Sequence, residues 1–185
     1  MITDLDGLQD RYTDYLSLID RRVYKISDHA FNMEEIFAKS KVDCHKVIVS
    51  QSSYSTEDNV FDGAFAIYDI AEGELVEKGI VRRLSDKDNR GFDGMNHSMV
   101  FTWSDDIPND TWAFASGCAT FYNTGLPGDC NTRMVRYFDE DRFEIFATKP
   151  IKAGDELTHT YKSLSWRTVF VPMEATLKAN KSDTV

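Results

Sequence analysis

The sequence has no long apolar run, no leader pattern and few cysteines. No stretch approaches the ~20 apolar residues that a membrane helix needs, and residues 1–10 lack the basic and then apolar order of a secretory signal. The cysteines are an odd number without C-x-x-C spacing, which argues against a disulfide framework or a structural zinc site. We therefore expect an intracellular protein without a membrane span, in which Cys44, Cys118 and Cys130 are small buried side chains.

Basic residues are also scarce, and the histidines are scattered. The 185 residues include 21 Lys and Arg against 31 Asp and Glu, which gives a net charge of −10. A surface of this sign repels the phosphates of nucleic acids and favours a basic peptide or protein as partner. His29, His45 and His159 do not have the spacing of metal ligands. Direct nucleic acid binding and a metal site are therefore not expected.

What the sequence does contain divides into three parts. Apolar residues recur every three or four positions over residues 3–24, which predicts an amphipathic helix, and a second helical stretch is indicated at Met33–Lys41. We interpret 1–45 as a helical N-terminal extension, 46–167 as the main domain and 168–185 as a C-terminal tail, frayed over Met173–Val185. The first helix would cap the domain, form a homodimer contact or recruit a partner, and the sequence leaves all three roles open.

The middle part has the texture of short β-strands. Alternation and turn residues predict strands at Lys46–Ser50, Ala64–Ile70, Leu75–Arg83, Thr132–Phe138, Arg142–Thr148 and Glu156–Tyr161. Turns are expected at Glu72-Gly73, at 139–141 and at 151–155, whereas Ser85–Pro108 is expected to be irregular or weakly helical. Many short strands joined by glycine-bearing turns predict a mainly β fold.

Three segments of this part form an ordered set of motifs. Phe61–Glu77 contains a glycine followed by F-A-x-x-x-I-x-x-G-E-x-V, Gly117–Thr124 leads through Asn123 to Asn131, and Ile151–Tyr161 reads I-x-x-G-x-E-L-x-x-x-Y. In this order and spacing, over roughly Lys46 to Arg167, they resemble the SET family of protein lysine methyltransferases. The chain most resembles the compact viral and algal SET proteins, which lack a zinc-binding post-SET element.

The resemblance implies a fold, an activity and a cofactor. The fold would be the SET-type β-clip, in which the Asn123 segment passes under the C-terminal loop as a pseudoknot. The activity would be methyl transfer from S-adenosyl-L-methionine to the ε-amine of lysine, leaving S-adenosyl-L-homocysteine, with Tyr161 as the catalytic residue. The resemblance assigns cofactor contacts to Asp62, Gly63, Ala64, Phe121, Tyr122, Asn123, Thr124, Tyr161 and Trp166. It assigns the substrate channel to Phe101, Trp103, Phe121 and Tyr161.

The chemistry of these residue types agrees with that assignment. Transfer of a methyl group from a sulfonium to an amine is an in-line displacement, so the protein mainly positions and desolvates. The lysine, with a pKa of about 10.4, must first lose a proton, and an aromatic channel lowers that pKa because it disfavours the ammonium. A hydroxyl such as that of Tyr161 can hold the methyl group by weak C–H···O contacts. A glycine such as Gly63 lets the backbone approach a ligand closely.

Two features depart from the family pattern. Thr124 stands where the family has a histidine after the asparagine. A literal Asn-His-Ser does occur at Asn96–Ser98, but it lies much farther from Tyr161 than Asn123 does, so we interpret it as a coincidental match. The channel also lacks tyrosines at Met99–Trp103 and just after Tyr161. Fewer hydroxyls would restrict a methylated amine less, which predicts a product shifted towards di- or trimethyllysine.

The sequence leaves the activity open between two interpretations. The first is an active methyltransferase whose acidic surface attracts a basic protein segment, a histone tail being one candidate. Such a protein would be nuclear if its substrate is a histone and cytoplasmic otherwise. The second is a SET module that binds cofactor or a basic peptide but has weak or no turnover. Thr124 and the smaller number of aromatic residues in the channel suggest this interpretation. An unrelated β-rich protein would require all three motifs to match by chance.

Overall fold

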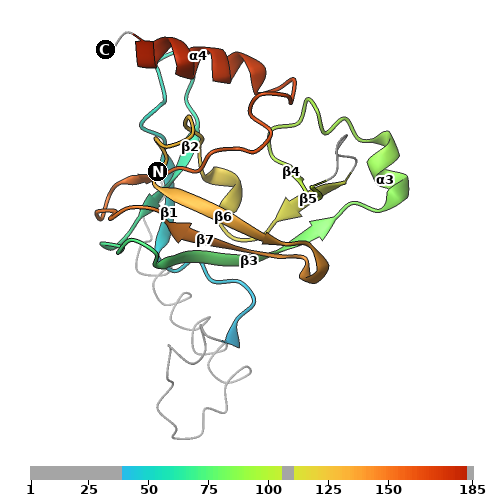
Figure 1. Ribbon diagram of the computed structural model, residues 1–185, viewed down its shortest axis with the longest axis horizontal. Coiled ribbons are helices and arrows are strands. Elements are labelled where there is room, and N and C mark those ends of the chain that lie inside the picture. The colour runs from blue at the N-terminus through green and yellow to red at the C-terminus, as the bar shows by residue number, and fades with distance from the viewer. Residues whose placement is uncertain (1–38, 106–110, 183–185) are drawn as a thin grey trace, which may run out of the picture. The chain divides into compact units, whose positions relative to one another are not determined.

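The computed structural model describes residues 39–105 and 111–182 (Figure 1). The chain divides into one unit at Met1–Lys39 and a second at Ser40–Val185, and only the second is described below. The helix expected at residues 3–24, and all but the last residues of the one expected at Met33–Lys41, lie outside the described residues.

Two antiparallel sheets form the described part of the fold. The first has the order β1-β2-β8 and the second the order β4-β5-β3-β7-β6; Figure 1 labels each of these strands except β8. The strands of the first sheet are β1 (Val47–Gln51), β2 (Asp62–Ala66) and β8 (Glu156–Leu157). Those of the second are β4 (Phe101–Thr102), β5 (Trp112–Ala115), β3 (Leu75–Arg83), β7 (Arg142–Ala147) and β6 (Thr132–Tyr137). The helical elements are α3 (Asp86–Gly91), η1 (Ala119–Phe121), η2 (Phe138–Glu140) and α4 (Val171–Ser182). The predicted mainly β fold is confirmed.

The central pair of the larger sheet, β3 and β7, follows from strict alternation. In β7 every second side chain is buried, beginning with Phe143, as the two-residue period of a strand requires. Gly79 of β3 stands opposite Phe143, and a Cβ at this glycine would lie 2.4 Å from the phenyl ring. The glycine therefore makes room for the ring. The buried apolar cluster draws residues from both sheets, including Ala64 of β2 and Ile145 of β7, so one core joins them.

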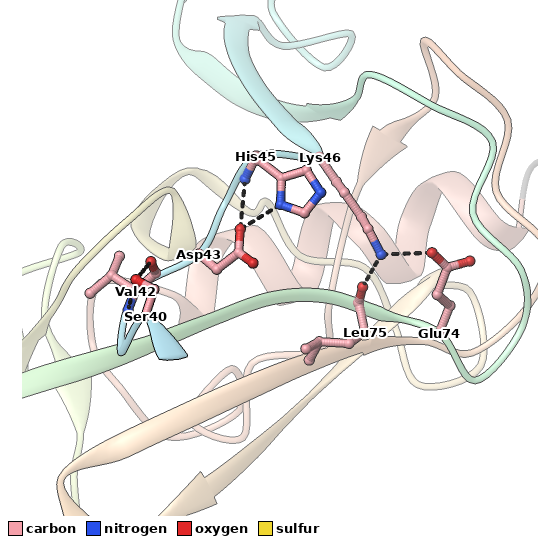
Figure 2. Close-up of polar contacts among 7 residues, drawn as sticks. All are labelled: Ser40, Val42, Asp43, His45, Lys46, Glu74 and Leu75. Atoms are coloured by element: carbon pink, nitrogen blue, oxygen red, sulfur yellow. Dashed lines mark hydrogen bonds and ion pairs between the residues drawn. The ribbon is translucent and has the colours of Figure 1, made fainter. Parts of the chain in front are cut away.

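The entry to β1 is fixed to the start of β3 by side chains (Figure 2). Lys46 Nζ donates to Glu74 Oε1 at 2.6 Å and to the carbonyl of Leu75 at 2.6 Å. Just before it, Asp43 forms a bridge with Lys78 of β3 and accepts the backbone N–H of His45 at 3.2 Å. These contacts set where β1 begins, close to its predicted start.

Two predicted strands end earlier than expected, the second because the chain changes partner. β2 ends at Ala66 rather than Ile70, and the exposed Ile67 and Tyr68 follow as a bend. β8 ends at Leu157 rather than Tyr161, because the next residues leave β2. Thr158 instead forms a parallel bridge with Asn123, and His159 forms one with Thr132. The β6–β7 hairpin agrees with its prediction, with Asp141 in the left-handed region at φ 50°, which aspartate tolerates.

The frayed tail predicted at Met173–Val185 is wrong over most of its length, because Val171–Ser182 forms α4. Pro172 stands in its first turn, where proline is favoured. Glu174 and Lys178 form an i,i+4 ion pair at 2.9 Å, and Lys181 binds the Asp129 carboxylate at 2.8 and 3.0 Å. An ion pair within the helix and one to a distant residue thus stabilise a helix that the composition of this segment does not predict. No helix within the described residues is both long enough and apolar enough to span a bilayer.

Candidate active site

The site forms where two segments distant in sequence run side by side. One contains Asn123 and Thr124, and the other follows β8 to Tyr161. The His159 N–H donates to the Asn123 carbonyl at 3.1 Å, and the Thr132 N–H donates to the Thr158 carbonyl at 2.9 Å. These parallel contacts are the pairing expected of the pseudoknot. They place the asparagine motif beside the tyrosine motif.

Asn123 belongs to a hydrogen-bond network around a carboxylate, here called the Glu156 network (Ser52, Ser53, Asn123 and Glu156). Asn123 Nδ2 donates to Glu156 Oε1 at 2.8 Å, to Ser52 Oγ at 3.1 Å and to the Asp62 carbonyl at 3.2 Å. Glu156 also accepts from Ser52 Oγ at 2.7 Å, from the Ser53 N–H at 2.8 Å and from Ser53 Oγ. Asn123 thus ties β2, β8 and the loop after β1 together.

The Glu156 network explains the glycine of the first motif. A Cβ at Gly63 would lie 2.3 Å from Glu156 Oε1 and 3.2 Å from Asn123 Nδ2, so a larger residue would displace a carboxylate held by several donors. Burial raises the pKa of Glu156, but the hydrogen bonds from Ser53, Asn123 and Ser52 outweigh it and hold this pKa below its ordinary value. At neutral pH the network therefore carries a negative charge.

Tyr161 is held by a separate set of contacts. Its hydroxyl donates to the Tyr122 carbonyl at 2.7 Å, and its ring packs against Phe170 with the centroids 4.9 Å apart. Its backbone N–H donates to Thr124 Oγ1 at 3.1 Å. Burial raises the pKa of the Tyr161 phenol, so the hydroxyl stays protonated and the orientation of the ring is fixed at both ends.

Tyr161 and Phe101 line one cavity of about 620 Å³, within the size range of small-molecule and cofactor sites. Its wall also includes Met134 of β6, His159 and Phe170. The structure thus brings together two of the four residues assigned to the substrate channel. Asp62, Gly63 and Asn123 converge on the Glu156 network instead and do not line the cavity.

Other side chains assigned by the resemblance lie elsewhere. Trp103 is buried against Phe138 and donates from Nε1 to Asp141 Oδ1 at 3.1 Å, and it does not line the cavity. Ala64 and Tyr122 are fully buried and do not line the cavity. Phe121 is half-buried against the core and outside the cavity lining. Trp166 is 42% exposed and is also outside it.

His159 lines the cavity, although the sequence indicated no role for it beyond the absence of metal-ligand spacing. It is buried, its Nδ1 has no hydrogen-bond partner among the described residues, and its ring centroid lies 5.3 Å from that of Tyr161. Burial, with a smaller effect of the Arg136 charge, lowers the pKa of His159 to about 4. The imidazole is therefore neutral at physiological pH. Its position two residues before the motif tyrosine was the only signal in the sequence.

Glu77 is a buried acid close to Tyr122. It accepts the Cys118 N–H at 2.8 Å, and burial raises its pKa to about 7. Burial and the nearby Glu77 raise the pKa of Tyr122 as well. Gly117, at φ +69°, leaves no room for a Cβ, which would lie 2.3 Å from Glu77 Oε1. Glu77 thus supports the turn that leads into η1 and the Asn123 segment.

In the literal Asn-His-Ser, Ser98 lines the cavity, but the Asn96 and His97 side chains make only local contacts. Asn96 Nδ2 donates to Asp93 Oδ2 at 2.7 Å in an exposed turn, and His97 Nδ1 accepts the Met99 N–H at 3.3 Å. Asn123, not Asn96, pairs with the tyrosine segment, as its spacing predicted. Across residues 39–105 and 111–182, no three His, Cys, Asp or Glu side chains are grouped so that they could hold a metal ion.

The sequence match to known proteins agrees with this geometry. The SET domain family matches residues 62–162, which include the paired segments with Asn123, Glu156 and Tyr161. Human histone-lysine N-methyltransferase 2B is 31% identical over 104 residues, which are 54% of this chain and 4% of that protein. The chain therefore spans a small fraction of the length of this relative.

Solved structures of Polycomb Repressive Complex 2 from Chaetomium thermophilum are also similar. One is 24% identical, with a TM-score of 0.49 and coverage of 69% of this chain and 17% of that chain. Another, in an autoinhibited conformation bound to S-adenosylmethionine, is 22% identical, with a TM-score of 0.48 and coverage of 73% and 17%. The family assignment rests on the sequence match, which covers more than half of this chain, and the expected SET fold is confirmed. The chain belongs to the SET domain family.

Proposed function

We propose that this protein transfers a methyl group from S-adenosyl-L-methionine to the ε-amine of a lysine in a protein segment. The observation that carries the proposal is the position of Tyr161. Within a SET domain, it meets Phe101 at one cavity while its hydroxyl is fixed to the Tyr122 carbonyl at 2.7 Å. A held tyrosine beside an aromatic wall is suited to aligning a methyl group and a neutral amine.

The residues proposed to hold the cofactor are neighbours in the structure. Asp62 and Gly63 adjoin Asn123, and Thr124 binds the backbone of Tyr161 at 3.1 Å. Main-chain groups at a buried glycine and an exposed Asp62 suit a polar ligand that carries both a carboxylate and an ammonium. We keep Asp62, Gly63, Asn123, Thr124 and Tyr161 as proposed contacts. S-adenosylmethionine would supply an electrophilic methyl group on a sulfonium there.

The cavity residues would prepare the substrate amine. Phe101, Met134 and Phe170 provide an apolar wall, which disfavours the ammonium and lowers its pKa. Because the Tyr161 hydroxyl donates its hydrogen to the Tyr122 carbonyl, the lone pairs of its oxygen are available for weak C–H···O contacts. The neutral His159 adds a nitrogen that can accept a hydrogen bond from an amine N–H.

A basic protein segment is the proposed substrate class. The net charge of −10 would raise the local concentration of Lys- and Arg-rich chains and speed their association. The relative at 31% identity is named as a histone-lysine methyltransferase, which supports a histone tail as the first candidate to test. We propose a nuclear location if the substrate is a histone and a cytoplasmic one otherwise.

The structure gives less support to an inactive binding module than the sequence alone does. Thr124 replaces the family histidine, yet its hydroxyl accepts the Tyr161 N–H and is buried. The pairing of the two motifs therefore keeps a side-chain support. The binding module remains the second candidate, because Trp103, Phe121 and Trp166 contribute nothing to the cavity.

Two measurements separate these functions. Calorimetry with S-adenosylmethionine, together with the melting temperature in S-adenosylhomocysteine, tests the cofactor, since a ligand of the native state raises stability. Transfer of a radiolabelled methyl group to mixed histones and ribosomal proteins then tests turnover. We expect both binding and transfer. Tight cofactor binding without transfer to any basic protein would favour the binding module, and no cofactor binding would contradict both.

A further inference from the structure

The cavity beside Tyr161 has the opposite charge to the rest of the protein. Five of its lining residues are cationic, and among the described residues no Asp or Glu lines it. The cations are Arg133, Arg136, Lys149, Lys162 and Arg167. The chain as a whole carries −10. A cationic wall in an acidic protein has a structural role or receives an anion.

Three of the five cations are engaged in the fold. Arg167 is buried and donates to the carbonyls of Gly94 at 2.7 and 3.2 Å, of Val100 at 3.0 Å and of His97. It fastens the loop before β4. Lys149 Nζ donates to the Asp129 carbonyl at 3.1 Å, and the Arg133 guanidinium lies 5.1 Å from the centroid of the Phe146 ring. Arg136 and Lys162 differ from these three because each also contacts a carboxylate, that of Asp105.

Arg136 and Lys162 converge on a single carboxylate oxygen. Arg136 Nη2 lies 3.3 Å from Asp105 Oδ1, and Lys162 Nζ lies 3.4 Å from the same atom. The side chains of Asp105 and Lys162 are 65% and 67% exposed, so these ion pairs are long, solvated and weak. Asp105 therefore marks a position for one anion, and water or another anion can compete for it.

Arg136, in contrast, is held in advance of any ligand. Its side chain is 9% exposed, and Nη1 donates to the Thr102 carbonyl at 2.8 Å and to Thr102 Oγ1 at 3.3 Å. The Phe138 ring centroid lies 5.1 Å from its guanidinium carbon. A guanidinium fixed in this way loses little entropy when it binds a carboxylate or phosphate.

The anion position adjoins the proposed lysine site on both sides. Lys162 directly follows Tyr161, and Thr102, which holds Arg136, directly follows Phe101. An extended peptide advances about 3.3 Å per residue. A lysine that enters between Phe101 and Tyr161 thus brings its near neighbours in the substrate to Arg136 and Lys162.

We propose that the substrate segment carries an anionic side chain, a carboxylate or a phosphate, within a few residues of the target lysine. This side chain replaces Asp105 between Arg136 and Lys162. The inference rests on the proposed function and narrows its substrate class. The acidic surface attracts a segment that is basic overall, while the local cations select one acidic or phosphorylated position within it.

The test uses peptides that share one lysine and differ at a single neighbouring position, which carries Gln, Glu, phosphoserine or Lys. This variable position is moved in turn through each of the neighbouring positions on both sides of the lysine. Affinity is measured by fluorescence anisotropy with the full chain in excess S-adenosylhomocysteine, so that turnover is not needed. At one position, the Glu and phosphoserine peptides should bind about fivefold more tightly than the Gln peptide. The preference should shrink as salt is added.

Two variants assign the preference to this position. Lys162→Met should abolish it, and Lys162→Glu should invert it in favour of the Lys peptide. Lys152→Met is the matched control, because Lys152 is an exposed lysine paired with Asp69 at 2.7 Å and does not line the cavity; it should leave the preference intact. Asp105→Asn removes the competing carboxylate and should strengthen binding of the anionic peptides while leaving the Gln peptide unchanged.

The outcomes are distinct from those that test methyl transfer. Equal affinity for the Gln, Glu and phosphoserine peptides at every position, or no peptide binding by protein that binds S-adenosylhomocysteine, would overturn the anion position. A fall in S-adenosylmethionine affinity in Lys162→Met, without loss of the peptide preference, would also overturn it, because the cation would then serve the cofactor. Protein that fails to bind S-adenosylhomocysteine would instead contradict the proposed function. Tighter binding of phosphoserine than Glu would assign the position to phosphate.

Discussion

The two sides of the Asn123–Tyr161 pairing are built in opposite ways. On one side, the Glu156 carboxylate is negative and accepts from Ser52, Ser53 and Asn123. On the other, the cavity is lined by cations, and His159 Nδ1 has no partner among the described residues. Buried polar groups are normally satisfied, because an unmade hydrogen bond costs about 1–3 kcal/mol. The first side therefore holds the fold together, whereas the second borders the cavity.

This difference gives the two motif residues different roles. Asn123 donates every contact of its amide nitrogen to the protein itself, so we expect its loss to appear first in stability. Tyr161 faces the cavity, so we expect its loss to appear first in turnover. Substitutions on each side therefore test this difference in role.

Tyr161→Phe should have the largest effect. The ring and its packing on Phe170 remain, but the oxygen that we propose aligns the methyl group is lost. We expect turnover to fall by about a hundredfold, equivalent to ~3 kcal/mol of activation free energy, with cofactor affinity nearly unchanged. Single-turnover kinetics and calorimetry measure the two quantities. Tyr54→Phe, at an exposed tyrosine, is the control, and unchanged turnover in Tyr161→Phe would remove this residue from catalysis.

Asn123→Ala should destabilise the fold by about 2–3 kcal/mol, because the partly buried Glu156 carboxylate loses its amide donor. Urea unfolding followed by circular dichroism measures the change. Asn96→Ala removes an exposed hydrogen bond to Asp93 and should cost less than about 0.5 kcal/mol. Equal losses in the two variants would show that the Glu156 network does not anchor the fold.

His159 should make stability depend on pH. The unfolded chain takes up a proton at this histidine below about pH 6.5, whereas the folded chain does so only near pH 4. Stability is therefore fully present above pH 6.5 and falls as the pH drops, by about 2 kcal/mol at pH 5 relative to His159→Phe. Glu77, whose pKa is raised to about 7, gives the opposite slope between its ordinary pKa of 4.5 and pH 7. The difference between wild type and His159→Phe isolates the histidine, and a difference that does not change with pH would contradict this account.

Thr124→Val should have the smallest effect, about 1 kcal/mol, through loss of the acceptor for the Tyr161 N–H. Thr124→Ser keeps the hydroxyl and should stay within about 0.5 kcal/mol of wild type. Thermal unfolding of both variants checks the pair. If serine and valine have the same effect, the hydroxyl does not support the tyrosine segment.

The parts of the fold that the sequence predicts well are those governed by neighbours along the chain. β3 agrees with its prediction at both ends, and β6 and β7 agree to within one residue, because alternation and a tight turn determine them locally. β8 was predicted too long because Thr158 and His159 change partner to Asn123 and Thr132, and no local pattern encodes that exchange. α4 was missed because part of its support is the contact between Lys181 and Asp129, far apart in the chain.

The site divides in the same way. The motif spacing predicted that Asn123, Thr124 and Tyr161 lie close together, and it favoured Asn123 over Asn96 as the motif asparagine. It could not show that Glu156 meets Ser52 and Ser53, about a hundred positions away, or that Trp103 turns into the core. His159 and the Arg136–Lys162 pair have meaning only through tertiary contacts, so composition and spacing could not identify them.

Tandem mass spectrometry of the product measures methyl transfer to lysine directly. The full chain is incubated with S-adenosylmethionine and a mixture of core histones and ribosomal proteins, beside a parallel reaction with Tyr161→Phe. We expect methyl groups on lysine Nζ, with di- or trimethyllysine among the products. We also expect a large loss of signal in the Tyr161→Phe reaction. No methylated lysine on any protein, in a preparation that binds S-adenosylhomocysteine, would contradict it.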